Sequence, residues 1–192
     1  MAAPAPVLAS ITPEQVWAWL AEVADPEIPV ISIVDLGIVR AVTLADGHCT
    51  VTLTPTYSGC PAMAVIAGAV TAALREHGMR QVTLHTALAP AWTTDWISED
   101  GKARLRGYGI APPCPGAYAY AGAHAVETAA HQIIDISRLP GGRARLSAAP
   151  VVACPQCASP RTEVLSQFGS TPCKALYRCL ACREPFDYFK HH

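Results

Sequence analysis

The chain has 192 residues, of which 51% are apolar and 15% are charged. This composition is typical of a globular protein and excludes an intrinsically disordered one. A net charge of −1 gives the chain as a whole no electrostatic attraction to nucleic acids or anionic membranes.

Segments that target proteins to membranes are not evident. Residues 1–14 contain no Lys or Arg, so the basic start of a signal peptide is missing. The longest apolar, uncharged run, residues 61–74, is too short to span a bilayer. Eight cysteines without an export signal favour metal binding or thiol chemistry over disulfides. We therefore expect a cytoplasmic protein with no membrane association.

A first domain is expected over residues 1–112, beginning with a helix and a hairpin. Thr12-Pro13-Glu14-Gln15 predicts a helix start with a Thr cap and a returning Gln. The helix should end before Asp25-Pro26, because a residue preceding proline avoids the helical region. Residues 37–44 and 49–54 predict two antiparallel strands, joined by a tight turn at Asp46-Gly47.

The second half of this domain predicts a crossover and another helix. Residues 60–77 have apolar residues at helical spacing and are followed by Gly78, which is typical of a helix end. Residues 81–88 predict a strand that a right-handed crossover would place parallel to its neighbour. Ser98 predicts the cap of a helix that runs to about Tyr108. We expect an α+β protein whose first domain is a small sandwich with helices on one face of a mixed sheet.

The remainder of the chain divides into a connector and a small C-terminal domain. Residues 113–149 are rich in Ala, Gly and Pro, and we interpret them as a connector with one short helix at 123–134. Residues 150–192 contain strand candidates at 162–167, 175–178 and 186–189.

Two Cys-x-x-Cys pairs in the C-terminal domain predict a metal site. Cys154/Cys157 and Cys179/Cys182 are separated by 21 residues, the arrangement of a zinc ribbon with two knuckles. Four thiolates can close a tetrahedral shell around zinc, and so short a domain needs metal to fold. The hypothesis is structural zinc, with an iron centre on the same ligands as the alternative.

A second candidate site is the loop before the helix at 60–77. Cys60 would lie at the helix N-terminus, where free amides and the helix dipole should lower its pKa. Asp25, Glu27 and Asp35 could join Cys60 in a mixed oxygen and sulfur metal site. The alternatives are an inert capping cysteine and carboxylates that bind the amides of their own turns.

The remaining candidates are weaker. Cys173 is either a small buried residue or a spare thiol that exchanges metal. From Val151 onward there are five Lys/Arg against three Asp/Glu, so nucleic-acid binding is not expected. The seven histidines form no His-x-x-x-His or Glu-x-x-His pair, which disfavours a built-in di-iron or catalytic zinc centre.

Taken together, several motifs resemble known families. Asp25-Pro26-Glu27-Ile28-Pro29, Asp35-Leu36-Gly37 and Cys60-Pro61 resemble the metal–sulfur cluster assembly family of small α/β domains. The tail, with Ser166-Gln167-Phe168-Gly169-Ser170-Thr171 and the cysteines around it, resembles the accessory subunits of phenylacetyl-CoA epoxidases.

This resemblance implies a maturation factor, not an enzyme. It implies oxygenase and reductase components of a multicomponent phenylacetyl-CoA epoxidase as partners, in phenylacetate degradation, and a homodimer is left open. Cys60 would be the functional thiol that transiently holds iron or an iron–sulfur cluster, with Asp25, Glu27 and Asp35 shaping its site. The alternatives are a Cys60-dependent thiol enzyme, or a structural or nucleic-acid-binding ribbon.

Overall fold

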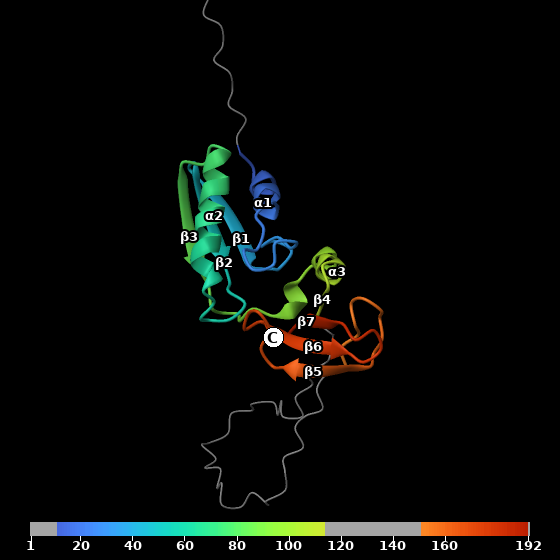
Figure 1. Cartoon of the computed structure of the whole chain (residues 1–192). Coiled ribbons are helices and arrows are strands. Elements are labelled where there is room, and N and C mark those ends of the chain that lie inside the picture. Colours follow the sequence, from blue (N-terminus) through green and yellow to red (C-terminus); the bar gives the residue numbers. More distant parts are fainter. Residues whose placement is uncertain (1–10, 114–150, 192) are drawn as a thin grey trace, which may run out of the picture.

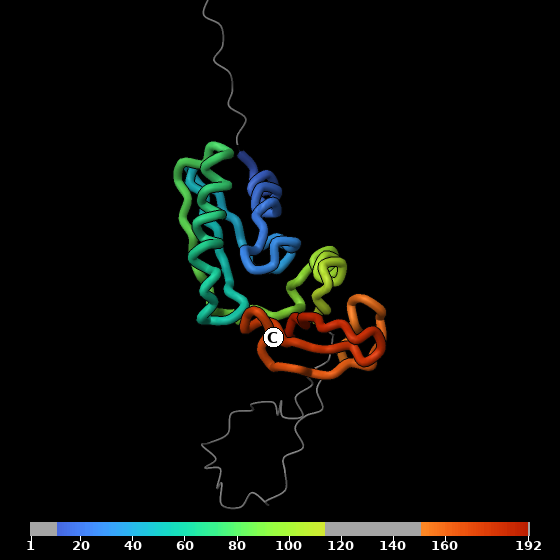
Figure 2. Tube along the Cα trace, viewed as in Figure 1, coloured from blue at the N-terminus to red at the C-terminus, as the bar shows by residue number. Residues whose placement is uncertain are grey.

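The computed structural model describes residues 11–113 and 151–191, arranged as two small sheets that lie side by side (Figures 1 and 2). Apart from Pro113, the connector expected at 113–149, with its helix at 123–134, lies outside the described residues. In the described part of the chain, no helix is long and apolar enough to cross a membrane.

Helix α1 spans Pro13–Ala21 and begins with the predicted capping box. The Gln15 amide donates to Thr12 Oγ1 at 3.3 Å, and the Thr12 amide donates to Gln15 Oε1 at 2.9 Å. Val16 and Leu20 are one turn apart and fully buried. The cap and the apolar stripe therefore place α1 as the sequence predicted.

The first sheet contains β1 (Val39–Ala45), β2 (His48–Leu53) and β3 (Gln81–Thr86) in that order. Strands β1 and β2 are antiparallel, and β2 and β3 are parallel. The connection between the parallel strands is α2 (Ala62–Glu76), which lies along the sheet (Figure 1). Alternate residues of β2 are buried in the same core as α1 and α2, so the predicted one-sided sandwich is confirmed.

Beyond this sheet the chain forms the 3-10 helix η1 (Thr94–Trp96), α3 (Glu99–Gly107) and β4 (Ile110–Ala111). Ser98 caps α3 as predicted, with its hydroxyl accepting from the Gly101 amide at 2.9 Å. The indole of Trp92 donates to the Leu36 carbonyl at 3.0 Å. These contacts tie the segment after β3 to the loop that precedes β1.

The second sheet contains β5 (Thr162–Ser166), β6 (Lys174–Cys179) and β7 (Pro185–Phe189), in the order β4-β7-β6-β5. The three ribbon strands form where the sequence predicted them. Strand β4 adds to them in parallel, with Ile110 opposite Asp187 and Ala111 opposite Tyr188. The domain boundary at residue 112 stays a prediction, and the strand just before it belongs to the ribbon sheet.

The two sheets also share a hydrophobic core. Cys173 and Phe189 come from the ribbon but are buried in the core built by α1, α2 and β2. The rings of Phe189 and Trp92 lie 6.0 Å apart. Figure 2 shows the ribbon next to the loop that leads into α2. The ribbon therefore packs directly on the first domain.

Candidate functional site

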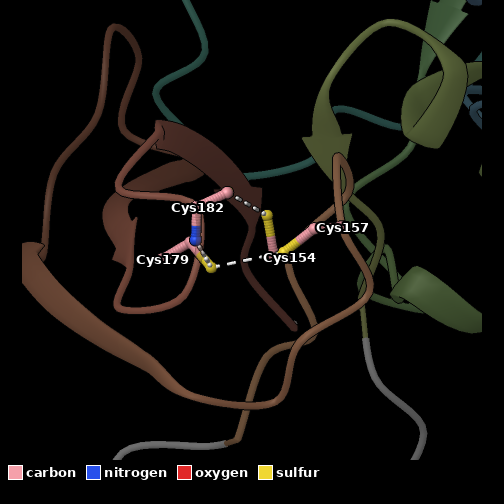
Figure 3. Close-up of side chains that lie close together, drawn as sticks. All are labelled: Cys154, Cys157, Cys179 and Cys182. Atoms are coloured by element: carbon pink, nitrogen blue, oxygen red, sulfur yellow. Dashed lines mark hydrogen bonds between the residues drawn. The ribbon is translucent and has the colours of Figure 1, made fainter.

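The four predicted ribbon ligands come together at one end of the second sheet (Figure 3). Cys154 and Cys157 precede β5, Cys179 ends β6, and Cys182 lies in the turn before β7. Their sulfur atoms all lie within 4.8 Å of one another. Two segments separated by a whole hairpin thus supply two ligands each.

The sulfur spacing fits a tetrahedral zinc ion. A Zn–S bond of about 2.3 Å places the sulfurs of a tetrahedron about 3.8 Å apart. The Cys154 and Cys182 sulfurs are 3.7 Å apart, and those of Cys157 and Cys179 are 3.5 Å apart. The donor set is four thiols with no oxygen ligand among them, which suits zinc and closes the site to substrates.

Backbone amides reinforce this arrangement. The amides of Ala181 and Cys182 donate to Cys179 Sγ at 3.4 and 3.5 Å. Because the Cys182 amide stabilises the thiolate, the pKa of Cys179 falls to about 6. Thiolates are the form that binds metal, so this turn prepares one ligand in advance.

Cys60 lies in the loop between β2 and α2, two residues before the helix begins. Pro61, not Cys60, is the N-cap residue. The net change in the Cys60 pKa is opposite to the prediction. Burial raises the pKa of this thiol, although the Ala62 amide at the start of α2 lowers it as predicted.

Asp25, Glu27, Cys60 and Cys173 line one small cavity between the two domains, with a volume of about 10 Å³. We call it the thiol–carboxylate cavity. Apolar side chains complete the walls, among them Phe189 from the ribbon. The structure thus brings Cys60 together with two of the three predicted carboxylates, and adds Cys173 from the other domain.

Both carboxylates have perturbed pKa values. Asp25 is 5% exposed, and its Oδ1 accepts from the amides of Glu27 and Ile28 at 2.9 and 2.8 Å. Burial raises its pKa despite these bonds. Burial also raises the pKa of Glu27, and the negative charge of Asp25 adds to the effect. Two loop amides already occupy Asp25 Oδ1, which leaves Asp25 Oδ2 and the Glu27 carboxylate as possible oxygen donors at the cavity.

Asp35 does not line the thiol–carboxylate cavity. Its carboxylate accepts from Ser32 Oγ at 3.0 Å and from Ser98 Oγ at 2.8 Å, and lies 3.3 Å from the guanidinium of Arg104. These contacts join the loop before β1 to α3. The structure therefore gives Asp35 a cross-linking role instead of a place beside Cys60.

Sequence reasoning missed two polar neighbours of the cavity. Lys174 is 4% exposed, and its Nζ lies 3.3 Å from Asp187 Oδ2. Its positive charge opposes the rise in the pKa values of Asp25 and Glu27. Burial, and next the charge of Cys60, raise the pKa of Tyr57. The sequence offered one indication of these neighbours, which is Cys173. This cysteine is not part of either Cys-x-x-Cys pair, and it directly precedes Lys174.

The fold thus defines a class of two-domain proteins, in which a mixed sheet covered by helices on one face is joined to a four-cysteine ribbon. Both domains match known family models. Residues 13–84 match an iron–sulfur cluster assembly protein family, and residues 140–190 match the PaaD zinc beta ribbon domain.

One relative matches nearly the whole chain. A protein of Escherichia coli (strain K12), assigned as one of the subunits of 1,2-phenylacetyl-CoA epoxidase, is 47% identical over 95% of this chain and 97% of its own length. The chain belongs to the family of this epoxidase component.

Other similar proteins match about half of this chain. An Fe-S protein maturation auxiliary factor of Porphyromonas gingivalis is 36% identical over 49% of this chain and 90% of its own length. The crystal structure of a domain of unknown function from Bacillus anthracis is 28% identical over 48% of this chain and 90% of that chain, with a TM-score of 0.46.

Proposed function

We propose that this protein is a non-catalytic accessory factor that assists metal-centre assembly in a multicomponent phenylacetyl-CoA epoxidase. The observation that carries the proposal is the thiol–carboxylate cavity, in which Cys60 faces the same space as Asp25 and Glu27. The client is inferred from the Escherichia coli relative, which matches 95% of this chain and is assigned as a component of that epoxidase.

The chemistry of the cavity suits transient binding of iron. A thiolate together with carboxylate oxygens is a ligand set that borderline metals such as Fe²⁺ accept. A site with few protein ligands leaves coordination positions for the groups of a client, so the metal can be passed on. Iron, as an ion or within a cluster, is thus the cargo of Cys60, and the ribbon quartet holds a separate structural zinc ion.

The surroundings of Cys60 favour a carrier over a thiol enzyme. A nucleophilic cysteine needs a neighbouring base to form its thiolate. Among the described residues that line the cavity, none is a histidine, and burial raises the pKa of the Cys60 thiol. A bound cation removes this obstacle, because it displaces the proton and stabilises the thiolate directly.

Reconstitution of the epoxidase tests this function. Apo-oxygenase and apo-reductase would be incubated without air with Fe²⁺, sulfide and either wild-type protein or the Cys60→Ala variant. We expect the variant to lose the activation while keeping its zinc and its cooperative melt. Cys49→Ala is the matched control, since Cys49 is a buried thiol on β2, away from the cavity. Full activation by Cys60→Ala would refute the proposal.

A further inference from the structure

We propose that Cys173 completes the Cys60 site, so that the two domains together bind one divalent transition-metal ion through two sulfurs and the Glu27 carboxylate. This inference rests on the proposed function, because it assigns the ligands and the form of the same cargo. It makes the ribbon a part of the metal-handling site, in addition to being a structural domain.

The position of Cys173 is fixed by the ribbon. Cys173 immediately precedes β6 and is 5% exposed, within the core of the first domain. Its carbonyl accepts from the Lys190 amide at 2.9 Å, and its sulfur lies 3.0 Å from Thr171 Oγ1. The turn thus holds the thiol at the wall of the cavity.

The other two ligands face the same cavity. Cys60 and Glu27 line it together with Cys173. Cys60 and Glu27 come from loops of the first domain, and Cys173 comes from the turn before β6 of the ribbon. Both domains therefore contribute possible donors to one space.

The size of that space suits a single ion. A cavity of about 10 Å³ corresponds to roughly one water-sized sphere. When M²⁺ binds, each thiol gives up its proton to solvent and forms one metal–sulfur bond, so the two protons carry away the charge that the ion brings.

The cavity differs from the ribbon site in the distances between its possible ligands. Within residues 11–113 and 151–191, the ribbon quartet is the group of three or more ligands whose donor atoms all lie within 4.8 Å. The ligands of the cavity are more widely spaced, so an ion must draw them together. Strain of this kind weakens binding, which suits a cargo that has to leave.

X-ray absorption distinguishes the two sites by element. Zinc-loaded wild-type protein would receive one equivalent of Co²⁺ without air, as a spectroscopic probe for Fe²⁺. We expect four sulfur neighbours at the zinc edge, and two sulfurs with additional oxygen at the cobalt edge. One sulfur or none at the cobalt edge would overturn the inference, even though Cys60 alone could still perform the proposed function.

Substitutions provide an independent test. Cys173→Ala should lower the affinity for Co²⁺ at least tenfold and reduce the sulfur count at the cobalt edge from two to one, while zinc stays bound. Cys49→Ala should change neither quantity. If Cys173→Ala binds Co²⁺ as wild type does and Cys60→Ala does not, the two-thiol site is wrong and the function of Cys60 stands. Loss of activation by Cys60→Ala without any loss by Cys173→Ala would lead to the same conclusion.

Discussion

Phe189 offers a direct test of the shared core. It is the last residue of β7 and is 1% exposed, although its own strand belongs to the ribbon sheet. Its ring lies 6.0 Å from that of Trp92, at an interplanar angle of 50°. Phe189→Ala would remove one of the side chains that join the ribbon to the first domain.

The expected loss follows from its burial. Truncating a buried Phe to Ala costs about 3–5 kcal/mol, of which about 1.5–3 kcal/mol is the lost transfer free energy and the rest reflects the cavity left behind. Phe189 also lines the thiol–carboxylate cavity, so the new space merges with an existing one that water can enter. We therefore expect a value near the lower end, about 3 kcal/mol, a large part of the roughly 5–15 kcal/mol that stabilises a typical domain.

Urea unfolding followed by tryptophan fluorescence measures this loss. Phe168→Ala is the matched control, because Phe168 lies in the same domain but is 67% exposed. Lys190 lies over its ring at 4.9 Å, so this control should lose no more than about 1 kcal/mol. If both variants lose the same free energy of unfolding, or if Phe189→Ala loses less than the control, the reasoning about the shared core is wrong.

Four further outcomes are expected. Cys154→Ser should release the zinc and unfold the ribbon, as metal analysis and circular dichroism would show; retained stoichiometric zinc would contradict a four-cysteine site. Gly37→Ala should lower the free energy of unfolding by about 1–3 kcal/mol, because Gly37 has a φ of +74° and an added Cβ would lie 2.7 Å from Trp96 atoms; Gly68→Ala, in open space on α2, should not destabilise. Because burial raises the Cys60 pKa, its alkylation rate should be below that of a free small thiol at neutral pH and should still increase above pH 9; a plateau below pH 8 would contradict this. Asp35→Asn should lower the melting temperature and leave client activation intact, whereas the reverse result would return Asp35 to the site.

The features predicted correctly from sequence depend on atoms that are close along the chain. The capping box of α1 is closed by Thr12 and Gln15 themselves. The turn at Asp46-Gly47 has φ values of 50° and 76°, which these two residue types adopt readily. Each Cys-x-x-Cys motif similarly supplies two of the four metal ligands within four residues. In each case the residues that form the pattern also make the contacts that stabilise the structure.

The features that sequence did not predict depend on contacts between distant segments. Strand β4 has only two residues, too few for an alternating pattern, and it forms because β7 lies beside it. The partner of Asp35 at the start of α3, Ser98, is 63 residues away. The direction of the Cys60 pKa shift depends on how deeply the thiol is buried. The sequence shows where the helix begins but not how deeply Cys60 is buried. Local patterns cannot supply such information.

The topology connects the structural metal site to the thiol–carboxylate cavity. Cys179 ends β6 and Cys173 directly precedes it, so the two thiols lie at opposite ends of one strand. Strand β6 is held on both sides, by β5 and by β7, and cannot shift without breaking two ladders. Because metal binding folds a domain of this size, a zinc ion at one end of β6 would fix the position of the thiol at the other. Removal of zinc by a chelator should therefore weaken Co²⁺ binding at the cavity even though no cavity ligand is altered, and unchanged Co²⁺ affinity in a zinc-free ribbon would show that Cys173 is positioned by the first domain alone.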